Sequence, residues 1–230
     1  MIKQFSSLYE MMKTFQDEQS CINHLRSIRW KNGVYCPHCG ANKVYHFTDN
    51  KNHKCGICLR RFSIKVGTIF EESKIPLRKW FMAIYLISSH KKGIASTQLA
   101  KDIKITQKTA WFMLQRLRFA TETKSFQEPL AGPVEIDETY IGGKEKNKQE
   151  IITHRDGGYS VGDRHTNAIE GAWSLLKRGK IGIYHHASQK HLPFYLHEFS
   201  YRYNTLQLNE GQRVNGLLGQ CAAGALLTRR

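Results

Sequence analysis

The sequence predicts an α+β chain of more than one domain, in which a cysteine-rich ribbon precedes a helical module and a small α/β part. Three observations support this prediction: paired cysteines between residues 36 and 58, apolar residues at helical spacing over 77–119, and a strand-like stretch at 134–141 that precedes a helix from residue 167. The 230 residues have room for two domains of roughly 100 to 150 residues each, but not for three of that size.

The chain is strongly basic. Lys and Arg number 35 against 19 Asp and Glu, which gives a formal net charge of +16 and a pI near 9.7. Such a charge suits a polyanionic partner, because neutralising phosphates releases condensed counterions. The alternative is a basic surface that only keeps the protein soluble. The charge therefore favours nucleic acid as the binding partner, and the motifs provide the further evidence.

The sequence contains no membrane or secretion signal. No apolar run approaches the roughly 20 residues of a membrane span, and the first residues, MIKQFS, lack the apolar region of a signal peptide. We therefore expect a cytoplasmic protein without a membrane partner. Thiols stay reduced in that compartment.

Four of the six cysteines are spaced as metal ligands. Two residues separate the members of each pair and 15 residues lie between the pairs, which is typical of a tetrahedral zinc site. Disulfides are disfavoured without a secretory signal, and a redox site needs only one such pair. The sequence predicts one structural zinc ion, on a ribbon of short strands, bound by Cys36, Cys39, Cys55 and Cys58. The isolated Cys21 and Cys221 are expected to be small buried side chains.

The next segment has a helix-turn-helix pattern. Apolar residues recur at helical spacing over 77–87, directly after Pro76, where a helix can begin. A short capped helix is then expected over Ser96–Asp102, and a second helix from Gln107 to about Phe119. Ordinary helical packing produces the same pattern, so the motif alone is weak evidence for DNA binding.

The second helix of this pattern supplies the candidate DNA contacts. Its inward positions are expected to be Ala110, Met113, Leu114 and Leu117. In a helix-turn-helix the first residues of the second helix reach base edges, and basic side chains bind phosphates. We predict DNA contacts from residues on its other faces, namely Gln107, Lys108, Trp111 and Arg118.

Acidic residues occur in two later motifs. Asp137 lies in the strand-like stretch, and Asn167 and Glu170 lie near the start of the later helix. Residues 170, 173, 174 and 177 fall at positions i, i+3, i+4 and i+7, so they share one face of that helix. The pair Asn167 and Glu170 also fits a helix capping box, which would account for both residues without any chemistry.

Taken in order, the motifs resemble those of one known family. They are CPHCG at 36–40, RFSIKVGTIF at 61–70, IPLRKW at 75–80, DETYIGG at 137–143, the HTN-I-E-W-K pattern at 165–177 and EFSYRYN at 198–204. The chain resembles the zinc-ribbon transposases of bacterial insertion sequences, the family numbered fifteen ninety-five, from about residue 16 to residue 204. The resemblance implies a DDE-type transposase with a ribonuclease-H-like core.

The resemblance also implies roles for particular residues. Asp137 would be the first ligand of catalytic Mg²⁺ or Mn²⁺, and either Asn167 or Glu170 would supply the third ligand position. Lys177 would hold a DNA phosphate beside the site. Two such metals, roughly 3.5 to 4 Å apart, activate the attacking oxygen and stabilise the leaving one, so they need carboxylates from separate elements.

The chain departs from the family pattern at the second catalytic aspartate. Only 29 residues, 138 to 166, separate Asp137 from Asn167, too few for the strands and helix that precede the second aspartate in the family. Asp156 and Asp163, the other aspartates of this interval, lie in glycine-containing, loop-like sequence, whereas metal ligands need rigid elements. Two hypotheses follow: a transposase, or an internally deleted relative that only binds DNA.

These interpretations divide the chain into three parts. Residues 1–70 are expected to form a helix and the zinc ribbon, 71–128 the helix-turn-helix module, and 129–230 a curtailed ribonuclease-H-like α/β core. A curtailed sheet exposes edges and apolar faces, so we expect the last part to be unstable alone or to dimerise. The expected partners are double-stranded DNA, as terminal inverted repeats and target DNA, and a second copy of the chain on that DNA.

Overall fold

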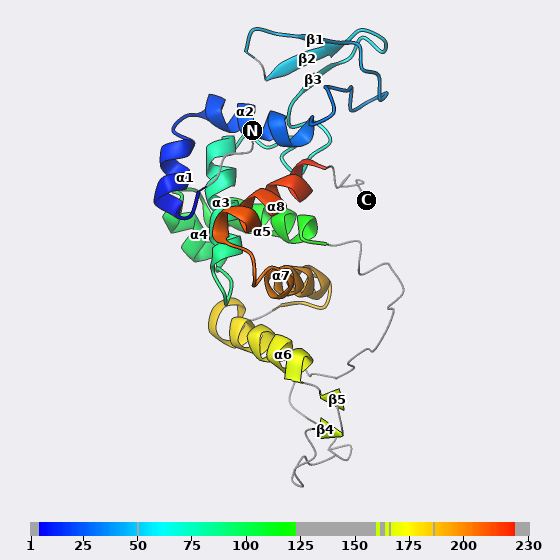
Figure 1. Ribbon diagram of the computed structural model, residues 1–230. Coiled ribbons are helices and arrows are strands. Elements are labelled where there is room, and N and C mark those ends of the chain that lie inside the picture. Colours follow the sequence, from blue (N-terminus) through cyan, green and yellow to red (C-terminus); the bar gives the residue numbers. More distant parts are fainter. Residues whose placement is uncertain are drawn as a thin grey trace.

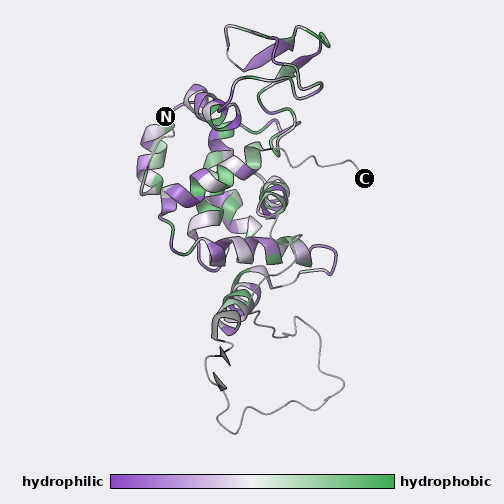
Figure 2. Ribbon diagram, turned by 45° about the vertical axis from the view of Figure 1, so that its right-hand side comes forward, coloured by the Kyte–Doolittle hydropathy of each residue, from purple (hydrophilic) through white to green (hydrophobic). Residues whose placement is uncertain are grey.

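The computed structural model describes residues 5–49, 51–122, 160–161, 164–165, 167–185 and 187–223. A small three-stranded sheet lies at one end of a body of packed helices, and helix α6 lies at the other end (Figures 1 and 2). The strand expected at 134–141, with Asp137, lies outside the described residues.

The small sheet is the expected ribbon. Its strands are β1 (Val44–His46), β2 (Asn52–Cys55) and β3 (Arg61–Ser63), all antiparallel in the order β1-β2-β3. Val44 pairs with Cys55 and His53 pairs with Phe62, so the sheet places Cys55 at the end of its central strand. The sequence predicts short strands over 43–48 and 53–55, and β3 extends the sheet beyond that prediction.

Two helices precede the ribbon, α1 (Leu8–Thr14) and α2 (Glu18–Arg29). Their N-caps are Ser7 and Asp17, whose side chains accept backbone N–H groups of the first turn. Arg29, at the end of α2, donates to the carbonyls of Ile64 and Val66 in the segment after β3. These contacts join the ribbon to the helical body.

Helices α3 (Leu77–Ser89), α4 (Ser96–Asp102) and α5 (Gln107–Ala120) follow, with bounds close to those expected from the sequence. The four inward positions predicted for α5 are buried. Helix α3 begins after Pro76, which forms no side-chain cap. The carboxylate of Glu18 instead accepts the backbone N–H groups of Leu77 at 2.8 Å and Arg78 at 3.2 Å, so α2 caps the start of α3.

The described C-terminal part is also helical. It contains the two-residue strands β4 (Ser160–Val161) and β5 (Arg164–His165), which form a hairpin, then α6 (Asn167–Gly179) and a π-helical turn, η3 (Lys180–Tyr184). Helices α7 (Leu192–Asn204) and α8 (Glu210–Ala222) complete it. Within the described residues, no sheet larger than this hairpin follows α5, so the expected ribonuclease-H-like core stays a prediction.

The last two helices pack onto the first half of the chain. Helix α8 lies against α2 and α3, and α7 lies against α5 and α6 (Figure 1). The buried face of α8 repeats at i, i+3, i+4 and i+7 and consists of Val214, Leu217, Leu218 and Cys221. Cys21 of α2 is fully buried as well, as expected for the isolated cysteines. Helices from both sides of the proposed boundary at residue 128 therefore share one core.

Hydropathy follows this packing. Apolar residues concentrate among the central helices (Figure 2), and nine of the 13 residues of α3 are buried. None of the described helices is both long and apolar enough to cross a membrane.

Candidate zinc centre and nucleic-acid interface

The four predicted zinc ligands lie together. Their sulfur atoms all lie within 4.8 Å of one another, with 3.7 Å between the Sγ atoms of Cys36 and Cys58 and 3.6 Å between those of Cys39 and Cys55. Each Cys-x-x-Cys turn contributes two of the sulfurs, from the two sides of the ribbon. This is the donor set of a closed, structural tetrahedral site.

Backbone donors surround two of these sulfurs and favour the thiolate of Cys55. The N–H groups of Ile57 and Cys58 point at Cys55 Sγ, at 3.3 and 3.4 Å, and the N–H group of His38 points at Cys36 Sγ at 3.4 Å. Burial raises the pKa of the Cys55 thiol, but these N–H groups and the neighbouring thiols outweigh burial and lower the pKa to about 6. Because zinc binds thiolates, the residues present fit a zinc ion.

The two histidines near the ligands in the sequence, His38 and His53, do not belong to the cysteine cluster. His38 is exposed, whereas His53 is buried, with its Nδ1 atom 3.0 Å from that of His46 and its ring packed against Trp30 and Phe62. Burial, with His46 and Arg26 nearby, lowers the pKa of His53 to about 4. His53 is therefore a neutral core residue of the ribbon.

The first turn of α5 presents the expected DNA-reading surface to solvent. Gln107 and Lys108 are exposed, and Gln107 Nε2 donates to Ser96 Oγ at 3.0 Å, which orients it across the start of α4. Trp111 is 40% exposed, and its ring meets that of His191 edge-on at 5.5 Å. Three of the four predicted DNA contacts are thus accessible.

Arg118 is not accessible, and its predicted role in holding a phosphate is wrong for this structure. Its side chain is 1% exposed, its Nε atom donates to Glu198 at 2.5 Å, and its guanidinium lies 4.0 Å from the Tyr195 ring centre. Burial alone would lower the pKa of Arg118, but the Glu198 carboxylate outweighs burial and raises it. The residue is a buried cation whose partner lies 80 positions later in the chain.

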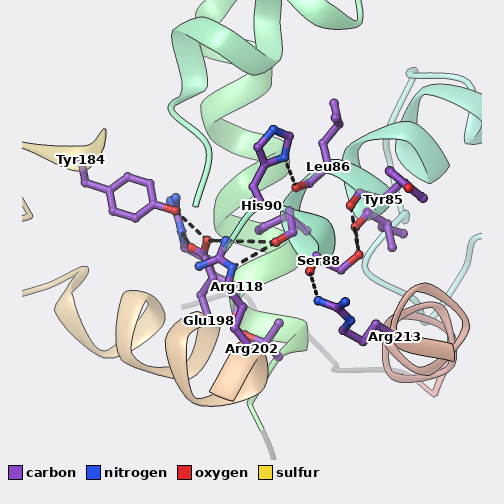
Figure 3. Close-up of polar contacts among 12 residues, drawn as sticks. Tyr85, Leu86, Ser88, His90, Arg118, Tyr184, Glu198, Arg202 and Arg213 are labelled. Carbon is purple, nitrogen blue, oxygen red and sulfur yellow. Dashed lines mark hydrogen bonds and ion pairs between the residues drawn. The ribbon is translucent and has the colours of Figure 1, made fainter. Parts of the chain in front are cut away.

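Glu198 of α7 is the centre of this network (Figure 3). Besides Arg118, it accepts from Arg202, which also donates to the Ile87 carbonyl, and from the Tyr184 hydroxyl at 2.7 Å. Burial would raise the pKa of Glu198, but Arg202 and Arg118 hold it below its usual range. The network joins α5, α7, the end of α3 and the turn after α6.

The π-helical turn carries Tyr184 into this network. Gly93, between α3 and α4, has φ +97°, and a Cβ atom there would overlap the Tyr184 hydroxyl. Gly93 therefore provides the left-handed backbone conformation of the α3–α4 connection and leaves space there for the Tyr184 side chain. The end of α6 is thereby held against the α3–α4 connection.

Helix α6 lines a groove of about 570 Å³. Its face contributes Glu170, Trp173, Ser174 and Lys177, which the sequence placed together. The groove is completed by residues that the sequence did not single out, namely Lys92, Arg178, Ile181, Gly182 and Ile183. Lys92 escaped notice because it comes from the α3–α4 connection, which only the tertiary fold brings here.

The candidate catalytic residues are only partly assembled in the described chain. Glu170 and Lys177 line the groove, and Asn167 begins α6. Glu170 is the one carboxylate among the described groove residues. Across the described ranges, the four cysteines form the one group of three or more potential metal ligands.

Comparisons with known families match the chain at both ends. A transposase zinc-ribbon domain matches residues 16–61, which contain the four cysteines, and an ISXO2-like transposase domain matches residues 149–204. The second match contains Asn167, Glu170, Lys177 and Glu198 but not Asp137. The zinc-ribbon match and the cysteine cluster together support a structural zinc ion.

A curated relative points the same way. An uncharacterized protein in the transposable element ISH50 of Halobacterium salinarum is 37% identical over 160 residues, which are 68% of this chain and 53% of the relative. The chain thus spans about half the length of that relative. No solved structure matches the chain. By its two domain matches and this relative, the chain is similar to insertion-sequence transposases that carry an N-terminal zinc ribbon.

Proposed function

We propose that this protein binds the DNA ends of an insertion sequence and catalyses metal-dependent strand cleavage and transfer there. The observation that carries the proposal is helix α6, which belongs to the stretch similar to a transposase domain and presents Glu170 and Lys177 in one groove. The exposed first turn of α5 and the basic charge of the chain support duplex DNA as the partner. We further infer a homodimer on the DNA.

The chemistry assigns separate tasks to the residues. Asp137, with Asn167 or Glu170, would hold Mg²⁺ or Mn²⁺, which when bound activates an attacking oxygen and stabilises a leaving one. Lys177, four residues after Trp173 on the same face, would bind a phosphate of the strand being cut. The first turn of α5 and the ribbon would hold the duplex in register.

A second candidate function is DNA binding without catalysis. It is favoured by the 29 residues between Asp137 and Asn167, which leave little room for a second aspartate on a rigid element. Such a protein would occupy the ends of the element and compete with an intact relative.

Excision in cells tests the two functions against each other. The chain is expressed beside a marker flanked by the element's ends, and the joined junctions are amplified. Junctions that appear with the natural chain and vanish with Asp137→Ala are the expected result for a transposase. If neither protein gives junctions while both shift end DNA in a gel, the chain only binds DNA. Junctions that persist in Asp137→Ala would contradict the assigned role of Asp137.

Lys108→Ala is expected to weaken duplex binding and to lower its salt dependence. Each phosphate contact contributes about 0.9 to the slope of log affinity against log salt, so the loss of one contact lowers the slope by about that amount. Titrating end DNA at several salt concentrations measures it. Lys13→Ala, which removes an exposed lysine from α1, is the matched control and should leave the slope unchanged. An unaltered slope in Lys108→Ala would remove Lys108 from the interface.

A further inference from the structure

The groove along α6 has a composition that the proposed roles of Glu170 and Lys177 do not explain. Three basic residues line it, Lys92, Lys177 and Arg178, against the single carboxylate of Glu170. All three basic residues are exposed. The groove therefore offers an excess of positive charge to solvent, which suits a phosphate-bearing ligand.

An aromatic side chain lies among these cations. Trp173 is half-buried and lines the groove, and its indole nitrogen is buried without a hydrogen-bond partner among the described residues. The part of the ring that lines the groove offers a stacking surface to a ligand with an aromatic face.

The walls of the groove fit a flat ligand. Ile181 is 74% exposed and lies beside Ile183, and the intervening Gly182 has open space where a Cβ atom would be. A tryptophan beside several cations is the combination found in sites for single-stranded nucleic acid. The groove volume, about 570 Å³, is in the range of sites for small molecules, so it has room for an unpaired nucleotide.

We propose that this groove binds single-stranded DNA, with a base stacked on Trp173 and the backbone held by Lys92, Lys177 and Arg178. The inference deepens the proposed function and rests on it for the source of the strand, which is an element end opened for cleavage. Because Lys92 lines the groove, both α6 and the α3–α4 connection contribute to it. The close contact between Tyr184 and Gly93 holds these two segments together. Stacking on an aromatic ring tolerates any base, so binding would show little sequence preference.

The test uses the zinc-loaded full chain and a fluorescent oligothymidine of roughly ten nucleotides, with binding followed by anisotropy. Trp173→Ala is expected to weaken binding roughly 5- to 150-fold, the loss that accompanies removal of one stacking partner. Trp173→Phe should restore part of it. Lys92→Ala should lower the salt slope by about 0.7, the value for one phosphate of a single strand.

Lys91→Ala is the matched control, because Lys91 is exposed next to Lys92 but does not line the groove. Thermal melting of each variant identifies any loss of binding that comes from unfolding. Oligothymidine binding that is unchanged in both Trp173→Ala and Lys92→Ala would overturn the proposal. An equal loss in Lys91→Ala and Lys92→Ala would also overturn it, because the effect would then be general charge.

Duplex end DNA, titrated in parallel, separates this proposal from the proposed function. Weaker single-strand binding by Trp173→Ala with unchanged duplex binding supports the groove. If the natural chain fails to bind duplex ends but binds oligothymidine through Trp173, the proposed function fails while the groove assignment stands. If Trp173→Ala lowers both affinities equally, the groove is part of a general DNA surface and the single-strand assignment is wrong.

Discussion

Glu198→Ala is expected to lower the free energy of unfolding by about 3 to 5 kcal/mol, the usual cost of removing one partner from a buried ion pair. The carboxylate is fully buried and is shared by Arg118, Arg202 and the Tyr184 hydroxyl. Without it, two guanidinium groups stay buried with no negative charge beside them. The helices they belong to, α5 and α7, would then lose their main polar contact.

Chemical denaturation followed by circular dichroism measures this loss. Glu122→Ala, at an exposed position just after α5, is the control and should change the free energy of unfolding by less than about 0.5 kcal/mol. Adding Arg118→Met to Glu198→Leu should recover part of the loss, because the pair is then removed together. Equal stability of Glu198→Ala and the natural protein would show that the network is not formed in solution.

The same network is expected to make the stability of the protein depend on pH in the acid range. The folded pKa of Glu198 lies below its ordinary value of 4.5, so its contribution to stability is complete above pH 4.5 and is lost as the pH falls through the lowered value. Glu198→Gln should be less stable than the natural protein near neutral pH. The difference should shrink in strong acid, where the natural carboxyl is protonated as well.

Zinc removal is expected to unfold the ribbon. Metal binding in small zinc domains is worth about 10 to 16 kcal/mol in apparent free energy, which far exceeds what the three short strands can supply. The ribbon buries few side chains of its own, mainly His53, Phe62 and two of the ligands. Four sulfurs within 4.8 Å of one another would repel as thiolates without a cation.

Hydrogen exchange before and after chelation measures this effect. Protection should be lost over 44–63 and retained over the helix Gln107–Ala120. Atomic absorption should find one zinc ion per chain in the natural protein and in His38→Ala, which removes a potential nitrogen ligand but none of the sulfurs. Cys36→Ser should behave like the metal-free protein. Full protection of the ribbon without metal would contradict a structural zinc ion.

Local sequence patterns predicted the local elements well. Helices α4 and α5 begin at the expected residues, and Thr106 caps α5 as its sequence pattern suggests. The cap expected for α4 is absent, because its N-cap residue is Ala95, which has no side-chain acceptor. The four cysteines meet because two short turns and a hairpin suffice to bring them together. Glu170, Trp173, Ser174 and Lys177 share a groove because one helix alone determines their common face.

Contacts between distant segments escaped the same reasoning. Arg118 looked like a surface cation because its partner, Glu198, lies on a helix 80 residues later. The cap that Glu18 provides for α3 and the contribution of Lys92 to the α6 groove are equally non-local. The expected division into successive units did not anticipate that α7 and α8 pack onto α5 and α3, because helical periodicity shows which face is apolar but not what covers it.

The position of α8 has a consequence for how the protein is made. Its apolar face fills the core between α2 and α3, and its backbone carbonyl at Cys221 accepts the N–H group of Ile69. During synthesis the apolar surfaces of α2 and α3 that α8 covers therefore stay exposed until residues 210–222 have been translated. A nascent chain at that stage is a substrate for chaperones, and a stop codon before α8 would release a product that cannot complete its core.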